Sequence, residues 1–123
     1  MDSLLDGLIG ECSALMVPME ELARGSEASG LGHEAFCDAL AKRIAHRYLD
    51  GSLDFDAADA AINNLHCFAF RPPEFEPGPY MWSVYHAFDA GEYLRPGDSP
   101  DISPADRYTR PQLLAIVAGG SPE

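Results

Sequence analysis

The sequence is poor in basic residues and has no long apolar run. Lys and Arg number 8 against 20 Asp and Glu, which gives a net charge of -12. Phosphate recognition needs clustered Lys and Arg, so we expect neither nucleic acid nor an anionic lipid surface as a partner. No segment approaches the roughly 18 uninterrupted apolar residues that a membrane-spanning helix needs. The charge favours encounter with a basic partner instead.

Cysteine is sparse and shows no pairing pattern. Cys12, Cys37 and Cys67 are odd in number, far apart and without a Cys-x-x-Cys motif. This spacing argues against a zinc knuckle and against a disulfide framework. We expect buried, reduced thiols that act as small hydrophobic side chains. Reduced thiols, together with the missing basic stretch in residues 1–6, predict a cytoplasmic protein.

The common catalytic and cofactor-binding motifs are absent. The chain has no Gly-x-Ser-x-Gly, no phosphate loop and no Gly-x-Gly-x-x-Gly. Residues 50–56 carry alternating oxygens like a calcium loop, but Phe55 stands where that loop requires glycine and Ala61 where it requires glutamate. We therefore expect a helix-capping turn there, and we predict no cofactor.

The histidines do not form a metal-binding pattern. None of the four pairs with another at helical spacing. His86 and Asp89 lie three residues apart, and Glu92 would join them only if the helix continued past Gly91. A metal site needs three or four convergent ligands, so no metal site is predicted.

Nucleophilic catalysis has little support in the sequence. His66 and Cys67 are neighbours, and neighbouring residues of a helix point about 100° apart. A cysteine–histidine dyad would need a partner from elsewhere, for example His33 or His86 near Cys37. No motif favours that arrangement, so we predict a protein that is not an enzyme.

The remaining composition is that of one soluble globular domain spanning residues 1–123. Hydrophobic residues make up 46% and charged residues 23%. Apolar residues recur at three- and four-residue steps, and no strand-like alternation persists. We predict an all-α fold, a compact bundle of four to five helices. The expected helices span about 3–24 with a break or kink at Pro18, 32–49, 54–70, 80–90 and 110–118.

The expected loops follow from glycine and proline. Residues 25–30 and 92–108 are rich in turn formers and are predicted to be irregular. A proline-rich loop at 72–79 precedes the aromatic fourth helix. Asp54 or Asp56 is expected to cap the third helix.

Aromatic residues concentrate in residues 68–93. Two explanations remain: they seal the bundle where the proline-rich loop crosses it, or they form a protein interface. Tyr85 and Phe88, three apart, are expected in the core. The candidate partner-binding residues are carboxylates without nearby basic residues, together with two aromatic residues beside them: Asp54, Asp56, Asp59, Glu74, Glu76, Tyr80 and Trp82.

Two stretches resemble small helical bacterial proteins, among them immunity-type proteins of contact-dependent or secreted toxin systems. One runs from Tyr48 to Phe55 and into Ala58-Asp59 and Ile62-Asn63-Asn64-Leu65; the other runs from Trp82 to Tyr93. Together they cover about half of the chain. The resemblance implies a cytoplasmic, non-enzymatic protein that binds a cognate toxin tightly, often through an acidic surface. It assigns no individual binding residue.

The leading functional hypothesis is therefore an acidic immunity- or antitoxin-like inhibitor that occludes a protein partner, such as a basic toxin. The first alternative is a homo-oligomeric interaction or structural module, for instance a homodimer. The second alternative is a small helical metal protein or enzyme that uses His86, Asp89 or Cys67.

Overall fold

The computed structural model describes residues 5–9, 19–69 and 79–119, and every regular element in these ranges is helical. The helices are α2 (Met19–Ser29), α3 (His33–Leu49), α4 (Phe55–Ala69), α5 (Pro79–Ala90), the π-helical turn η1 (Ala105–Thr109) and α6 (Arg110–Val117). A further helical segment covers residues 5–9. The predicted all-α bundle is confirmed. No helix in the described ranges has the length and apolar character needed to cross a membrane.

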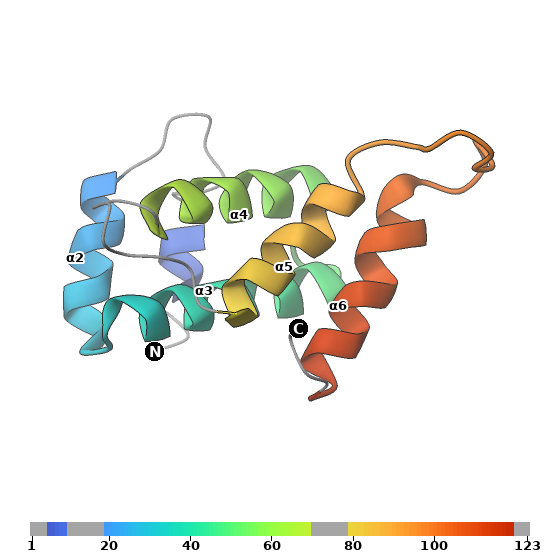
Figure 1. Cartoon of the computed structure of the whole chain (residues 1–123). Helices are drawn as coiled ribbons and strands as arrows, with labels where there is room; N and C mark the ends of the chain where they lie inside the picture. The colour runs from blue at the N-terminus through green and yellow to red at the C-terminus, as the bar shows by residue number, and fades with distance from the viewer. Residues whose placement is uncertain (1–4, 10–18, 70–78, 120–123) are drawn as a thin grey trace.

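Helix α3 is the centre of the bundle. It packs against α4, α5 and α6, and α2 contacts it near its start. Figure 1 shows α5 crossing in front of α3 and α4, with α2 at one end of the molecule and α6 at the other. Helices α4 and α5 run antiparallel, so the start of α4 lies beside the end of α5.

The core forms where the apolar stripes of these helices meet. The larger side chains that are completely buried come from five helices and from segment 5–9: Ile9, Leu22, Phe36, Leu40, Ile44, Ile62, Leu65, Met81, Val84, Phe88 and Leu113. Burying one such side chain contributes about 1.5–3 kcal/mol relative to exposing it. The apolar faces of the predicted helices therefore form the core, as expected for amphipathic helices that need to bury one face against their neighbours.

Helix α3 also makes two polar contacts that position its neighbours. Nε2 of His33 lies 3.0 Å from the carbonyl oxygen of Ala69, at the last residue of α4. The backbone N–H of Met81, in the first turn of α5, donates to Oδ1 of Asp38 at 2.9 Å. Each contact satisfies a backbone group that a helix end leaves without an intrahelical partner.

The expected boundaries of the middle helices are confirmed to within a residue. Asp54 caps α4, because its Oδ1 accepts a hydrogen bond from the backbone N–H of Ala57 at 2.8 Å. Helices α3 and α5 end near residues 49 and 90, where glycines 51 and 91 follow. Pro18, Cys12 and residues 72–78 of the predicted proline-rich loop lie outside the described residues, and Pro79 is the first residue of α5.

The expectation of a loop at residues 25–30 is wrong, because α2 continues to Ser29. A Cβ atom at Gly25 would lie 2.5 Å from Cδ1 of Leu8. Gly25 therefore lets segment 5–9 approach α2 closely, and the packing outweighs the weak helix propensity of glycine. The helix ends one turn later, where Gly30 adopts a φ of 73°.

The expectation of irregular structure across 92–108 is wrong for its last four residues. The turn η1 begins at Ala105 and leads directly into α6. Thr109, the last residue of η1, is completely buried, and its hydroxyl donates to the carbonyl oxygen of Ala87 at 2.7 Å. The wide π-helical turn therefore accompanies an inward-facing threonine that joins η1 to α5.

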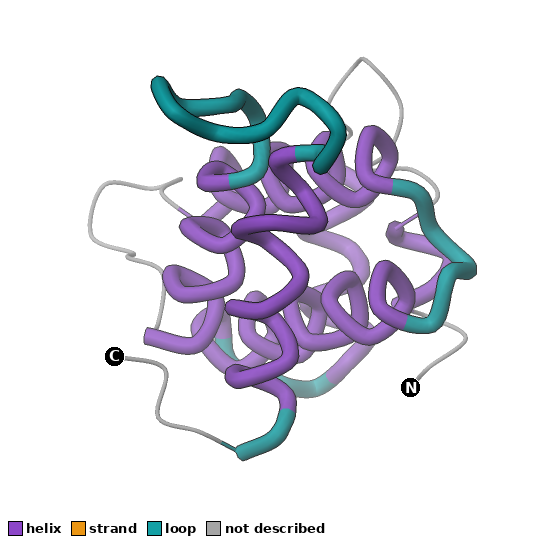
Figure 2. The backbone as a smooth tube through the Cα atoms, turned by 90° about the vertical axis from the view of Figure 1, so that its right-hand side faces the viewer, coloured by secondary structure: helices purple, strands orange, loops and turns teal. Residues whose placement is uncertain are grey.

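The long connection between α5 and η1 extends beyond the helices, at the top of Figure 2. Asp98 stabilises this connection, because its carboxylate accepts hydrogen bonds from the Tyr108 hydroxyl and from the backbone N–H of Arg95. The Arg95 guanidinium carbon lies 3.9 Å from the centroid of the Tyr108 ring. These contacts define the shape of the loop without regular secondary structure.

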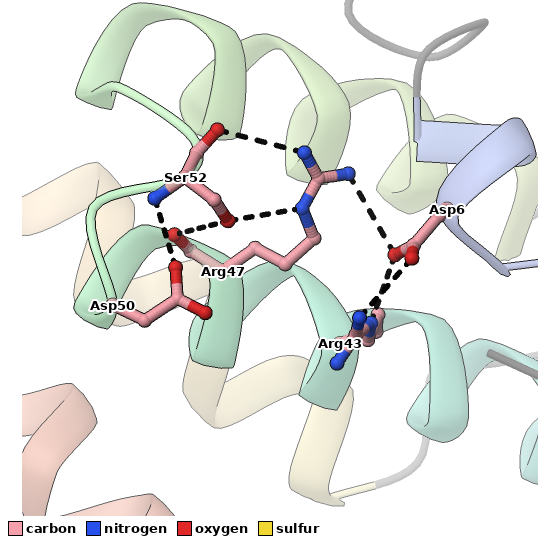
Figure 3. A network of polar contacts seen from close by, with 5 residues as sticks. All are labelled: Asp6, Arg43, Arg47, Asp50 and Ser52. Carbon is pink, nitrogen blue, oxygen red and sulfur yellow. Dashed lines mark hydrogen bonds and ion pairs between the residues drawn. The ribbon is translucent and has the colours of Figure 1, made fainter. Parts of the chain in front are cut away.

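Segment 5–9 is joined to α3 by the polar network of Figure 3. Asp6 accepts two hydrogen bonds from Arg43, at 2.8 and 3.1 Å. A nitrogen of Arg47 lies 3.7 Å from the same carboxylate. Arg47 also donates to the hydroxyl of Ser52, whose backbone N–H donates to Asp50. The paired guanidinium of Arg43 lowers the pKa of Asp6 below its ordinary value.

We expect the Asp6–Arg43 pair to stabilise the attachment of segment 5–9. A double-mutant cycle with Asp6→Asn and Arg43→Gln, followed by urea unfolding at pH 7 and low salt, should give a coupling of about 0.5 kcal/mol, because the pair is partly exposed. Since the pKa of Asp6 is lowered by folding, this contribution is present at neutral pH and is lost as the pH falls through its folded value. Equal coupling in 1 M salt would contradict an ionic contact.

We expect Gly91 to be required for the packing of η1 on α5. A Cβ atom there would lie 2.0 Å from Oγ1 of Thr109 and 3.0 Å from Cα of Ala105. Gly91→Ala should therefore lower the free energy of unfolding by about 2 kcal/mol, measured by urea denaturation. Gly7→Ala is the matched control, because a Cβ atom there meets nothing within 4 Å. Similar stability of the two variants would contradict the close approach.

Candidate functional site

The predicted partner-binding residues divide among several places in the structure. Asp54 and Asp56 are exposed at the start of α4, and Asp59 is half-buried one turn later. Trp82 is 38% exposed on α5. Glu74 and Glu76 lie outside the described residues.

Tyr80 lies apart from the other candidates, on the side of α5 that faces α3. Its ring packs against the core, and it lines a cavity of about 240 Å³ with Asp38, Ala39 and Lys42. Burial, followed by the charge of Asp38, raises the pKa of its hydroxyl above the ordinary value. The side chain is therefore placed to seal the contact between α3 and α5.

The antiparallel packing of α4 and α5 produces one continuous candidate site, which we call the α4–α5 face. Its acidic end contains Asp56, Asp59, Asp89 and Glu92; its aromatic end contains His66, Trp82, Tyr85 and His86. Asp59 and His66 are seven residues apart on α4, so the two ends are about 10 Å apart.

At the acidic end, four carboxyl groups from two helices and a turn meet. Oδ1 of Asp59 is shielded from solvent and has no hydrogen-bond partner. Burial, followed by the nearby Glu92 carboxyl and the charges of Asp89 and Asp56, raises the pKa of Asp59 to about 7. The protonated form of Asp59 is therefore favoured more than it would be for an isolated carboxyl group in water.

At the aromatic end, an imidazole lies flat between α4 and α5. The His66 ring is 4.1 Å from the Tyr85 ring and 5.3 Å from the Trp82 ring, at interplanar angles of 14° and 8°. The ring of His86 lies 4.6 Å from that of Trp82. Burial, followed by the charge of His86, lowers the pKa of His66 below its ordinary value. The neutral imidazole is therefore favoured in the stack.

The expectation that Tyr85 and Phe88 both belong to the core holds for only one of them. Phe88 is completely buried and packs beside Tyr48 and Phe55. Tyr85 is half-buried on the α4–α5 face. Position 85 points toward α4 at the edge of the contact, so only part of the ring is covered.

Sequence reasoning did not join His66, Tyr85, Asp89 and Glu92 to the candidate binding residues. A signal for them was present. Positions 82, 85, 86 and 89 recur at helical steps on one side of α5, and positions 59, 63 and 66 do so on α4. The missing information was that these two sides face the same direction.

A second cluster combines Cys37 and His33 on α3, the residues named for a dyad. Sγ of Cys37 lies 3.9 Å from Nε2 of His33. That nitrogen also lies 3.0 Å from the Ala69 carbonyl oxygen, which can only accept, so Nε2 carries a hydrogen and cannot take a proton from the thiol. Burial, with the charges of Asp38 and Glu34, raises the pKa of Cys37 to about 12. The Cys37 thiol therefore stays protonated in this contact and is not activated as a nucleophile.

Metal ligands do not converge in the described ranges. No group of three or more His, Cys, Asp or Glu side chains there has an arrangement that could hold a metal ion. His86, Asp89 and Glu92 follow one another near the end of α5, but they are divided between the aromatic and the acidic end of the α4–α5 face.

We expect the Asp59–Glu92 pair to make stability depend on pH. The pKa of Asp59 is raised by folding, so its contribution is fully present at about pH 4 and is lost as the pH rises through about 7. Asp59→Asn removes the charge and keeps the shape and polarity of the side chain. This variant should exceed the wild type in free energy of unfolding by about 1–2 kcal/mol at pH 8, after allowance for partial solvent screening, and by little at pH 5.

The measurement is urea unfolding of both proteins between pH 5 and 8. Asp101→Asn is the matched control, because Asp101 is exposed in the loop that follows α5 and the same charge is removed. A difference between wild type and Asp59→Asn that stays constant with pH would contradict the raised pKa of Asp59.

Comparison with known proteins gives no match: no protein-family model, no curated protein and no solved structure is similar to this chain. The resemblance to immunity-type proteins therefore stays a prediction, and the chain is assigned to no family.

Proposed function

We propose that this protein is an acidic, non-enzymatic binding protein that occludes a basic protein partner in the manner of immunity- or antitoxin-type inhibitors, and that it acts in the cytoplasm. The observation that carries the proposal is the α4–α5 face. It combines clustered carboxyl groups with an exposed Trp82 whose ring is stacked on His66.

The chemistry of this face suits a cationic protein surface. An arginine or lysine can lie over the exposed indole, where the negative π face attracts a cation. A second basic residue about 10 Å away reaches the carboxyl groups at the acidic end. The tryptophan is held by stacking before binding, so little side-chain freedom is lost on association. The net charge of -12 adds long-range attraction for such a partner.

The proposal favours binding over nucleophilic catalysis because the cysteine–histidine contact of α3 does not activate its thiol. The His33–Cys37 contact has a deactivated thiol.

The test is affinity capture with three tagged proteins: wild type, the face variant Trp82→Ala/Asp89→Asn, and the control Asp101→Asn. We expect one stoichiometric basic protein to be retained by the wild type and the control and to be lost as salt rises. The purified partner should bind the face variant at least tenfold more weakly, because the variant loses both the indole and a carboxylate.

Two results would contradict this function. Equal affinity of the face variant and the wild type would place the binding surface elsewhere. Recovery of the bait alone, with a solution mass of two chains, would favour the homodimer, for which the exposed apolar side chains Leu31, Leu94, Ile102 and Leu114 would be the first contacts to examine.

A further inference from the structure

We propose that this protein forms a homodimer through the end of the molecule built by residues 93–104 and α6, with α6 packed antiparallel against α6 of a second copy. We call this surface the α6 end. The inference goes beyond the proposed function and is independent of it, because none of the residues that define the α4–α5 face belongs to the α6 end.

Exposed apolar side chains concentrate at the α6 end. In the described part of the chain, six large apolar side chains are exposed, and four of them are Tyr93, Leu94, Ile102 and Leu114. Figure 2 looks onto this end of the molecule, with α6 in front and the long connection from α5 above it. Apolar groups that gather on one end of a soluble protein mark an interaction surface.

Helix α6 presents one of two neighbouring leucines to solvent. Leu113 is completely buried and anchors the helix in the core, whereas Leu114 is 50% exposed. Pro111, Gln112 and Ala115 are exposed on the same helix. The outer side of α6 is therefore apolar or uncharged, and the core does not cover it.

Charge is distributed in a way that sets this end apart. Residues 111–119 carry no charged side chain. Over residues 93–119, three arginines balance three aspartates, so the rest of the chain carries the whole net charge of -12. The balancing residues are Arg95, Arg107, Arg110, Asp98, Asp101 and Asp106.

This distribution favours a second copy as the occupant. An isologous interface brings the same surface of two chains together, so a net charge on that surface repels its own copy. The α6 end has no such net charge, whereas a basic foreign protein is attracted to the acidic parts of the chain. Two copies of this acidic protein therefore meet with least repulsion at the α6 end.

The size of the side chains on α6 suits helix-to-helix packing. Ala115 and Ala118 are exposed beside Leu114, and small side chains let two helix axes approach to about 8 Å. Leu114 lies near the middle of α6 (Arg110–Val117). In an antiparallel pair of α6 helices, the two Leu114 side chains therefore lie beside each other at the twofold axis.

The connection before η1 is held in place without a partner. The Arg95 guanidinium carbon lies 4.7 Å from the centroid of the Tyr93 ring and 3.9 Å from that of the Tyr108 ring. Tyr108 belongs to η1, which continues directly into α6. Since these contacts fix Tyr93 beside η1, little conformational freedom is lost when two copies associate.

The first measurement is sedimentation equilibrium of the wild type over a range of about 5–200 μM, which brackets the micromolar dissociation constant expected of a small interface. The mass should rise from one chain to two with concentration. Between low and high salt the dissociation constant should fall about threefold, because screening weakens the repulsion between two chains of net charge -12. A basic foreign partner should show the opposite salt dependence.

A matched pair of variants locates the contact. Leu114→Glu should raise the dimer dissociation constant at least tenfold, because it places two carboxylates together at the twofold axis. Leu31→Glu is the control, because Leu31 is 37% exposed in the turn between α2 and α3, at the opposite end of the molecule in Figure 1. It should dimerise as the wild type does.

A mixing experiment separates a lost contact from a lost fold. Leu114→Glu and Leu114→Lys should each be monomeric alone, and an equal mixture should form a dimer because the two opposite charges then meet. Only folded chains can give this rescue. Ala115→Glu, at the exposed neighbouring position, should also weaken the dimer and leaves Leu114 itself unchanged.

Several results would overturn the inference. A mass of one chain at every concentration and salt would exclude the dimer. A dimer that Leu114→Glu and Leu31→Glu weaken equally, or that neither weakens, would place the contact elsewhere, and failure of the mixture to dimerise would exclude antiparallel pairing of α6. Loss of the dimer in Trp82→Ala/Asp89→Asn would assign self-association to the α4–α5 face, whereas unchanged dimerisation of that variant is expected whatever partner the face binds.

Discussion

The packing of α4 and α5 on the apolar side of α3 is the contact on which the rest of the structure depends, and two polar contacts join the neighbouring ends of both helices to α3. His33 contacts the carbonyl at the end of α4, and Asp38 accepts the backbone N–H of Met81 at the start of α5. The last residue of α4 and the first turn of α5 therefore both lie beside the first half of α3. Since the end of one helix lies near the start of the other, α4 and α5 run antiparallel. The α4–α5 face depends on this arrangement, because its acidic and aromatic ends each need residues from both helices.

The regular helices could be predicted because their signals are local. Asp54 caps α4 with its own side chain, and apolar spacing gives α3 and α5 within a residue. The errors occur where a distant contact overrides local preference. Gly25 remains helical because Leu8 packs on it, and η1 forms where Thr109 reaches the carbonyl of Ala87. Neither contact leaves a pattern in the neighbouring sequence.

The candidate face was only partly predictable for the same reason. The acids of α4 and the exposed tryptophan could be named from charge and aromatic content. Asp89 and Glu92 join Asp59 only because α5 lies antiparallel to α4. The raised pKa of Asp59 depends on burial and on acids from another element, and a list of carboxylates along the chain does not contain that information.

The close approach of Gly91 to Thr109 has an evolutionary consequence. Positions 91 and 109 constrain each other, because the Thr109 side chain that donates to the Ala87 carbonyl leaves no space for a Cβ atom at Gly91, so change at one requires compensating change at the other. Exposed positions 82, 86 and 89 lie on the same helix but outside that contact. Descendants of this chain can therefore diversify the surface presented to a partner while the backbone beneath it is inherited unchanged.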